Sequence, residues 1–165
     1  DDIMSEIIKV GMADLKVCTY PDSLTTLGLG SCVGIALYDS VTKVTGLAHI
    51  MLPDSTKITK NENIAKFADT GIAETLRLML LQGANRKRIV AKIAGGADMF
   101  GLANASKSTF RVGASNIEAA KENLKKLGIP LVAEDVGKNY GRTVIIRSED
   151  GAFVIKSVGK PIKEI

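Results

Sequence analysis

The sequence predicts an α+β fold, because many short strand-like segments accompany two segments with helical periodicity. The chain has 165 residues, of which 45% are hydrophobic, and this is enough for one compact domain with a sizeable core. We therefore expect one domain over residues 1–165, with residues 1–6 and 159–165 as terminal tails. Trp is absent and Phe and Tyr are few, so the core must be mostly aliphatic.

The N-terminal half alternates apolar segments with turns. Residues 33–39 and 43–52 are continuous apolar runs rich in β-branched and small residues, which is typical of strands buried on both faces. We expect a turn centred on Ser40 and Val41 to join them. Shorter strands are expected at residues 7–12, 14–20 and 24–27.

Two later segments show the periodicity of amphipathic helices. The first starts near Ile64 and ends before Gly83, which stands where a C-cap glycine is expected. The second is expected to begin at a capping box formed by Ser115 and Glu118 and to end at Gly128. Further strands are expected at residues 88–94, 131–136, 142–147 and 152–158.

Composition excludes several classes of function. The net charge of +4 comes from 22 basic and 18 acidic residues that are dispersed along the chain, so nucleic-acid binding is not indicated. Two cysteines and one histidine make a poor metal site, and we expect no metal and no other cofactor. No apolar run approaches the roughly 20 residues that span a bilayer, and residues 1–9 lack the pattern of a signal peptide. We expect a cytoplasmic protein that is not inserted in a membrane.

The segment from residue 26 to residue 49 is the most informative for chemistry. If the turn between the two buried strands centres on Ser40 and Val41, the register sets Cys32 directly opposite His49. Directly opposed residues point to the same face, with Cβ atoms about 4.5–5.5 Å apart. A thiol and an imidazole could then meet. A loop longer or shorter by one residue would shift this register.

A neighbouring imidazole would suit a nucleophilic thiol. Only the thiolate attacks, and a base such as His49 can take the proton from Cys32 and later deliver it to the leaving group. Thr26 is close enough along the chain to orient the base by its hydroxyl or carbonyl group. Gly30 and Ser31 precede the cysteine in a glycine-rich turn whose N–H groups could stabilise an oxyanion.

A structural interpretation of the same residues stays open. A cysteine beside a glycine-rich turn is more often a small buried residue, and a histidine in an apolar run is more often a hydrogen-bonded core residue. The same holds for Gly95, Gly96 and Phe100, which form either a strand-end turn with an apolar anchor or the border of a site that binds substrate or partner. Cys18 has no neighbouring base and is expected to be a packed strand residue.

These residues also carry a family resemblance. The chain resembles the CheD-type chemoreceptor glutamine deamidases in seven stretches. They are TLGLGSC (26–32), GLAHIMLPDS (46–55), AKFADTGI (65–72), KIAGGADMF (92–100), residues 112–118, LVAEDVG (131–137) and GRT (141–143). Ser115 and Lys138 depart from the family pattern, which usually has arginine at the first position and glycine at the second.

The resemblance implies a protein-glutamine glutaminase in which Cys32 is the nucleophile, His49 the base and Thr26 the third residue. Its substrates would be methyl-accepting chemotaxis receptors, and a CheC-type phosphatase would be a partner. The implied fold is a β-sandwich-like core of mixed sheets flanked by helices in α/β/β/α layers, similar to cytotoxic necrotizing factor catalytic domains. Two alternatives remain: another cysteine hydrolase, and a non-catalytic adaptor that binds receptors or phosphatase.

Overall fold

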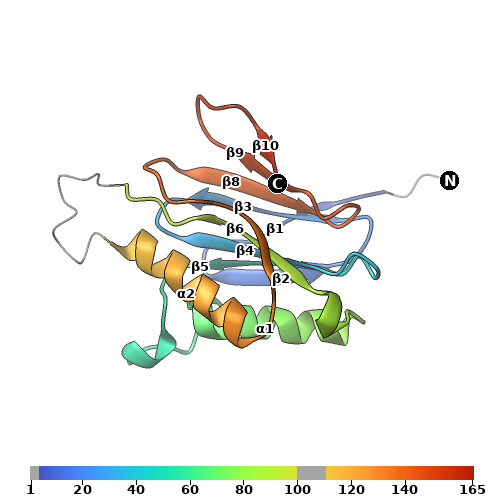
Figure 1. Ribbon diagram of the computed structural model, residues 1–165, viewed down its shortest axis with the longest axis horizontal. Helices are drawn as coiled ribbons and strands as arrows, with labels where there is room; N and C mark the ends of the chain where they lie inside the picture. Colours follow the sequence, from blue (N-terminus) through green and yellow to red (C-terminus); the bar gives the residue numbers. More distant parts are fainter. Residues whose placement is uncertain (1–3, 100–110) are drawn as a thin grey trace.

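The computed structural model describes residues 4–99 and 111–165, which form two five-stranded β-sheets and two α-helices (Figure 1). In spatial order the first sheet contains β1 (Ile7–Lys9), β3 (Ser23–Leu29), β8 (Arg142–Arg147), β9 (Phe153–Lys156) and β10 (Lys163–Glu164). The second contains β2 (Asp14–Cys18), β5 (Thr45–Ile50), β4 (Val33–Tyr38), β6 (Val90–Gly95) and β7 (Leu131–Val136). We call them the outer sheet and the inner sheet.

Both sheets are mixed. The pairs β1–β3 and β6–β7 are parallel, and the other paired strands run antiparallel. The predicted α+β class is confirmed. None of the helices in the described part of the chain is both long and apolar enough to cross a membrane.

The helices α1 (Ala68–Leu81) and α2 (Val112–Lys126) cover the same face of the inner sheet (Figure 1). Helix α1 packs on β2 and β5, and α2 packs on β4, β6 and β7. The described residues thus make helix, sheet and sheet layers, and the expected helix layer on the far side of the outer sheet is wrong. The reason lies in the outer sheet, because β8 alternates buried and half-buried residues and needs cover on one face.

Strands β4 and β5 of the inner sheet are buried on both faces, as predicted. Every residue of β4 and β5 is buried. Val33, Ile35 and Leu37 belong to the apolar cluster beneath the helices, whereas Ala36 and Leu47 belong to the cluster between the two sheets. Side chains at even positions of β4 and odd positions of β5 therefore point into the gap between the sheets.

Both helix starts differ from the sequence prediction. Residues 64–66 form a 3₁₀ turn, η2, and Phe67 is extended, so α1 begins at Ala68. Helix α2 begins at Val112, and Ser115 donates its N–H to Arg111 O over 3.0 Å inside the first turn. The predicted capping box is therefore wrong.

The helix ends agree with the prediction. Gly83 and Gly128 follow the two helices with φ of 101° and 73°, the left-handed conformation expected of C-cap glycines. Two further 3₁₀ turns are η1 (Ser55–Lys57) and η3 (Arg86–Arg88).

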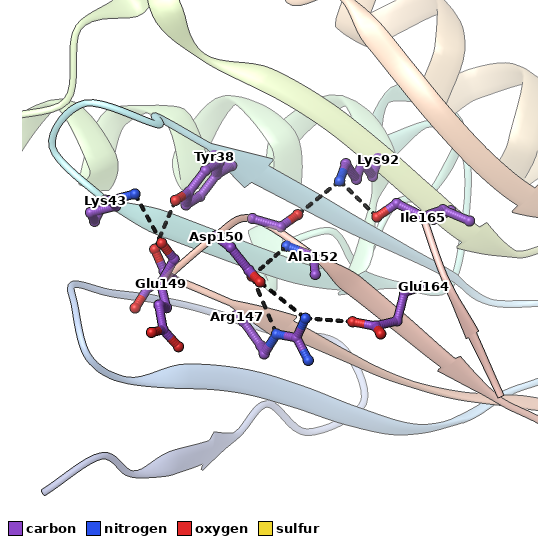
Figure 2. A network of polar contacts seen from close by, with 11 residues as sticks. Tyr38, Lys43, Lys92, Arg147, Glu149, Asp150, Ala152, Glu164 and Ile165 are labelled. Atoms are coloured by element: carbon purple, nitrogen blue, oxygen red, sulfur yellow. Dashed lines mark hydrogen bonds and ion pairs between the residues drawn. The ribbon is translucent and has the colours of Figure 1, made fainter.

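A polar network fastens the two sheets where β8 turns into β9 (Figure 2). Tyr38 of the inner sheet donates its hydroxyl to Ser148 O over 2.8 Å. From the same sheet, Lys92 Nζ donates to Gly151 O and Ile165 O over 2.8 and 2.7 Å. Side chains of the inner sheet thus donate to backbone carbonyls of the β8–β9 turn and of the C-terminal residue.

The segment 159–165, expected as a tail, contributes an edge strand. Strand β10 pairs with β9, and Ile165 exchanges two backbone hydrogen bonds with Phe153. Residues 4–6 at the other end form no strand, although Glu6 N–H donates to the Asp22 carboxylate over 3.0 Å.

Candidate active site

The candidate site lies between the two sheets, at the end where β4 begins. Cys32 directly precedes β4 and is 8% exposed, within the apolar cluster between the sheets. His49 lies on β5 with its side chain on the same inter-sheet face, and it is fully buried. Thr26 lies on β3 of the outer sheet and is also fully buried.

A bulge in β3 shapes the strand that carries Thr26. The pairing of β3 with β8 shifts between Thr26 and Leu29, and Gly28 adopts φ of 69°. Because the bulge adds a residue, Thr26 and Leu29 both point inward although they are three residues apart. The chain then enters the cysteine loop, residues 30–32.

The predicted opposition of Cys32 and His49 is wrong by two residues. In the observed ladder Gly34 is the partner of His49. The turn is longer than expected because Asp39 organises it: its carboxylate accepts the N–H of Val41 over 3.0 Å, and its carbonyl accepts the N–H of Lys43. The turn centre moves one residue along the chain, so the register shifts by two.

A shift of two residues keeps every side chain on its face. Cys32 and His49 therefore still point into the same gap and become diagonal neighbours, a relation that places Cα atoms about 7–8 Å apart. Gly34 stands between them and has no side chain to separate the thiol from the ring. A Cβ at Gly34 would come within 3.1 Å of Leu29 Cδ1.

The contact between Thr26 and His49 fixes the imidazole tautomer. Thr26 Oγ1 lies 2.7 Å from His49 Nδ1 and 2.8 Å from Val10 O. A carbonyl can only accept, so the single hydroxyl proton goes to Val10 and Nδ1 must carry the proton that Oγ1 accepts. His49 Nε2 is left with its lone pair. It is buried and has no hydrogen-bond partner within the described residues.

Burial keeps both reactive groups neutral at rest. It raises the pKa of the Cys32 thiol, although the backbone N–H of the same residue acts in the opposite direction. It lowers the pKa of His49. The resting pair is thus a thiol and a neutral imidazole, which is the form of histidine that can accept a proton. At Cys18, burial and then the charge of Asp22 raise the pKa to about 12.

The backbone of the cysteine loop is held by its carbonyl groups. Gly30 O accepts from Ala97 N–H over 2.8 Å, and Cys32 O accepts from Gly96 N–H over 2.8 Å. Ser31 O accepts from Asn116 Nδ2 over 3.0 Å. In a trans peptide the N–H points opposite to the C=O. The N–H groups of Ser31 and Cys32 are therefore turned away from these anchors.

Gly95 and Gly96 lie behind the cysteine loop and allow close backbone contact. A Cβ at Gly95, where φ is 111°, would lie 2.3 Å from Cys32 O. A Cβ at Gly96, where φ is 66°, would lie 2.3 Å from Ile117 Cγ1. The side chain of Met99 lies beside Gly30 of the loop, since a Cβ added at Gly30 would lie 3.4 Å from Met99 Cγ. Phe100 lies outside the described residues.

Asn116 is a site residue that sequence reasoning missed. It is fully buried on α2, and its Nδ2 donates to Ser31 O and to Met51 O, each over 3.0 Å. A signal was present, because Asn116 lies at helical spacing from Ala120 and Leu124 and so interrupts the apolar stripe of α2 with an amide. In residues 4–99 and 111–165, no group of three His, Cys, Asp or Glu side chains could hold a metal ion.

Comparisons with known proteins show which family the chain belongs to. A model of the CheD family, described as chemotactic sensory transduction, matches residues 51–157. The "probable chemoreceptor glutamine deamidase CheD" of Lachnoclostridium phytofermentans is 60% identical, over 98% of this chain and 100% of that protein. The protein of the same name from Caldanaerobacter subterraneus subsp. tengcongensis is 55% identical, over 98% and 99%. The "chemoreceptor glutamine deamidase CheD" of Halalkalibacterium halodurans is 48% identical, over 98% and 100%.

Among solved structures, the hypothetical protein YfiH of Bacillus licheniformis aligns with a TM-score of 0.45 and 17% identity. The alignment covers 78% of this chain and 58% of that one. A likeness at this level supports no conclusion about the fold. The expected similarity to cytotoxic necrotizing factor domains stays a prediction.

Proposed function

The chain belongs to the CheD family, and on that premise we propose that it is a protein-glutamine deamidase that acts on chemoreceptors. Such an enzyme hydrolyses the side-chain amide of glutamine to glutamate and releases ammonia. The names of the relatives support this activity. The family resemblance inferred from the motifs is confirmed.

The state of His49 is the observation that carries the proposed mechanism. Its Nδ1–H is engaged by Thr26, and its Nε2 is unprotonated and has no partner in the described part of the chain. The ring shares a face with Cys32 across a glycine. No hydrogen bond within the described residues joins the sulfur to Nε2. Rotation of the cysteine side chain would close the remaining gap, and catalytic hydrogen bonds commonly tighten when substrate binds.

In the first step the Cys32 thiol gives its proton to His49 Nε2 as the sulfur attacks the carboxamide carbon. A C–S bond forms, and the carbonyl oxygen takes the electron pair of the C=O π-bond. The imidazolium then returns the proton to the amide nitrogen, and ammonia leaves as the C–N bond breaks. The product of this half-reaction is a thioester on Cys32.

Water completes the reaction. His49 Nε2 takes one proton from the water as its oxygen attacks the thioester carbon. The C–S bond breaks, and the sulfur recovers a proton from the imidazolium. The net change is one amide and one water converted to one carboxylic acid and one ammonia.

The loop residues supply the stabilising donors in this proposal. The carbonyl groups of Gly30 and Ser31 are anchored away from the sulfur, so the N–H groups of Ser31 and Cys32 are free to face the oxyanion. The influence of the Cys32 N–H on its own thiol supports a location near the sulfur. A donor of this kind contributes about 3–4 kcal/mol of transition-state stabilisation in other enzymes.

Two further parts of the proposal come from the sequence. Binding of a CheC-type phosphatase rests on the motif resemblance alone, and a cytoplasmic location is the expectation drawn from composition and apolar patterning. Gly95 and Gly96 support the cysteine loop, and a direct contact of these residues or of Phe100 with substrate or partner stays a prediction. Co-purification with a CheC-type phosphatase, compared between the unaltered protein and Met99→Ala at the loop, would test the partner.

Mass spectrometry of a chemoreceptor fragment tests the activity. Each glutamine converted to glutamate adds about one mass unit and releases one ammonia. We expect conversion with the unaltered protein and with Cys18→Ala, and none with Cys32→Ala. Cleavage of the fragment backbone would identify a peptidase. Cys32→Ala that binds and still converts glutamine would contradict the proposal, and binding without conversion by the unaltered protein would identify an adaptor.

Alkylation tests the pairing of thiol and base without a substrate. Iodoacetamide should label Cys32 faster than Cys18 at pH 7, because Cys18 has no base and a pKa raised to about 12. His49→Ala should slow the labelling of Cys32 and leave that of Cys18 unchanged. Equal rates at the two thiols would count against the paired site.

A further inference from the structure

One amide group joins the two segments that carry the proposed nucleophile and base. Asn116 Nδ2 donates one hydrogen to the carbonyl of Ser31, the residue before Cys32. It donates the other to the carbonyl of Met51, two residues after His49. Both distances are 3.0 Å, and the side chain is fully buried.

We propose, building on the function proposed above, that Asn116 is a positioning residue that holds the cysteine loop against the strand of the base. The bond to Ser31 O fixes the peptide unit between Ser31 and Cys32. The N–H of that unit belongs to Cys32 and points the opposite way, toward the sulfur side. Release of this peptide would turn both the N–H donor and the sulfur relative to His49 Nε2.

The chemistry of the site favours an amide. Two carbonyl oxygens on different segments can only accept, so the residue between them presents two N–H donors from one atom. An amide nitrogen does this without placing a charge in a fully buried position. This contact pattern also fixes the orientation of the amide, since Oδ1 in the place of Nδ2 would face two acceptors. An aspartate would repel both carbonyls, and a serine could satisfy one of them.

The packing of α2 is arranged for the short reach of asparagine. A Cβ at Gly113 would lie 2.5 Å from Ala97 O and 2.6 Å from Gly96 O, so glycine lets the helix touch the segment behind the cysteine loop. This close approach brings Asn116, one turn further along, within hydrogen-bond distance of both carbonyls.

The buried amide of Asn116 also carries an unfavourable free energy. Asn116 Oδ1 is buried and has no partner among the residues described. A buried acceptor without a partner is unfavourable, and an apolar residue would continue the stripe of α2 without it. An amide retained under these conditions is consistent with a role in holding the two carbonyls.

The test compares Asn116→Ala and Asn116→Ser with two controls on the same helix. Asn123→Ala removes an amide whose Nδ2 donates to Ala119 O of its own helix, away from the cysteine loop. Leu124→Val removes one buried methylene from the core beneath the helices and serves as a variant of lowered thermal stability. All variants carry Cys18→Ala, so that iodoacetamide reports on Cys32.

We expect Asn116→Ala to lower kcat about tenfold or more with KM changed less than about threefold, as for a loss confined to the transition state. The pH profile of Cys32 alkylation should move to higher pH, because the thiolate loses its N–H donor. Asn116→Ser should lie between Asn116→Ala and the parent, and Asn123→Ala should match the parent. If Asn116→Ala does not fold, Asn116→Ser is judged by the same criteria.

Two results would overturn the proposal. One is a folded Asn116→Ala, or Asn116→Ser in its place, with the parent's kcat and alkylation profile. The other is Leu124→Val with the same changes at an equal loss of thermal stability. If the parent itself converts no glutamine, the proposed function fails, while the alkylation profiles still decide the role of Asn116.

Discussion

Replacing Thr26 with valine tests how the imidazole of His49 is held. Valine has nearly the shape of threonine, so the gap between the sheets stays filled. What disappears is the hydroxyl that donates to Val10 O and accepts from His49 Nδ1. Two buried polar groups, Val10 O directly after β1 and His49 Nδ1 on β5, would then lack this partner.

The structure gives a magnitude for both stability and catalysis. A buried donor or acceptor left unsatisfied costs about 1–3 kcal/mol, so two of them should lower the free energy of unfolding by about 2–6 kcal/mol. In catalysis the Nδ1–H bond becomes charge-assisted once Nε2 has taken the proton, and such a bond contributes about 1.5–3 kcal/mol. Its loss should lower kcat/KM roughly 10- to 150-fold.

Ammonia release from a chemoreceptor fragment measures the catalytic effect, at a temperature where each variant is folded. Thr26→Ser is the matched control because it keeps the hydroxyl and removes a methyl group, and we expect its kcat/KM within about threefold of the parent. If Thr26→Val stays within about twofold of Thr26→Ser, the argument that Thr26 sets the tautomer and orientation of His49 is refuted.

Three further predictions concern stability. Burial lowers the pKa of His49, so the neutral ring contributes fully to the free energy of unfolding above about pH 6.5. This contribution is lost as the pH falls through the folded-state pKa, with a slope of up to about 1.4 kcal/mol per pH unit. Urea titrations should show this loss in the parent and not in His49→Gln. Gly151→Ala places a Cβ 2.5 Å from the Tyr38 ring at φ of 74°. Gly159→Ala is the control, because its φ is 71° and no atom lies within 4 Å of the added Cβ. Thermal denaturation should show Gly151→Ala about 2 kcal/mol less stable than Gly159→Ala. Asp39→Asn removes a buried charge that Arg88 contacts with Nε and Nη2 at 3.0 and 3.1 Å. Urea denaturation should show a loss of about 2 kcal/mol, against about 0.5 kcal/mol or less for Glu74→Gln in the exposed pair with Arg77. Equal losses would contradict a stabilising role of the buried ion pair between Asp39 and Arg88.

Much of the fold could be predicted from local patterns, and the differences have physical causes. Continuous apolar runs identified β4 and β5 as strands buried on both faces, because such a run cannot leave one face in water. The capping box at Ser115 was misplaced because the local pattern of serine and glutamate carries no information on the turn that starts at Val112. The placement of both helices on one face depends on how strongly the strands of each sheet alternate between buried and more exposed residues. This alternation is a property of the assembled sheets.

The register between β4 and β5 could not be predicted, because it depends on the side chain of Asp39. A carboxylate that accepts N–H groups from its own turn stabilises a longer loop than apolar patterning suggests. Asn116 escaped prediction for a related reason. Its partners are carbonyls of residues 31 and 51, and an amide in the apolar stripe of α2 does not by itself indicate which distant groups it contacts.

The error in register leaves Cys32 and His49 on the same face of the sheet. A strand has a period of two, so a two-residue slip moves a side chain along its face, whereas a one-residue slip would have turned Cys32 toward the helices. Pairing therefore determines the face, and the distance between thiol and imidazole depends on what holds the cysteine loop. Here that loop is held from α2 by Asn116 and, from the segment that follows β6, by the backbone of residues 96 and 97. The geometry of the proposed reaction is thus set by elements distant in sequence from Cys32 and His49, and substitutions there should change the rate without touching either reacting group.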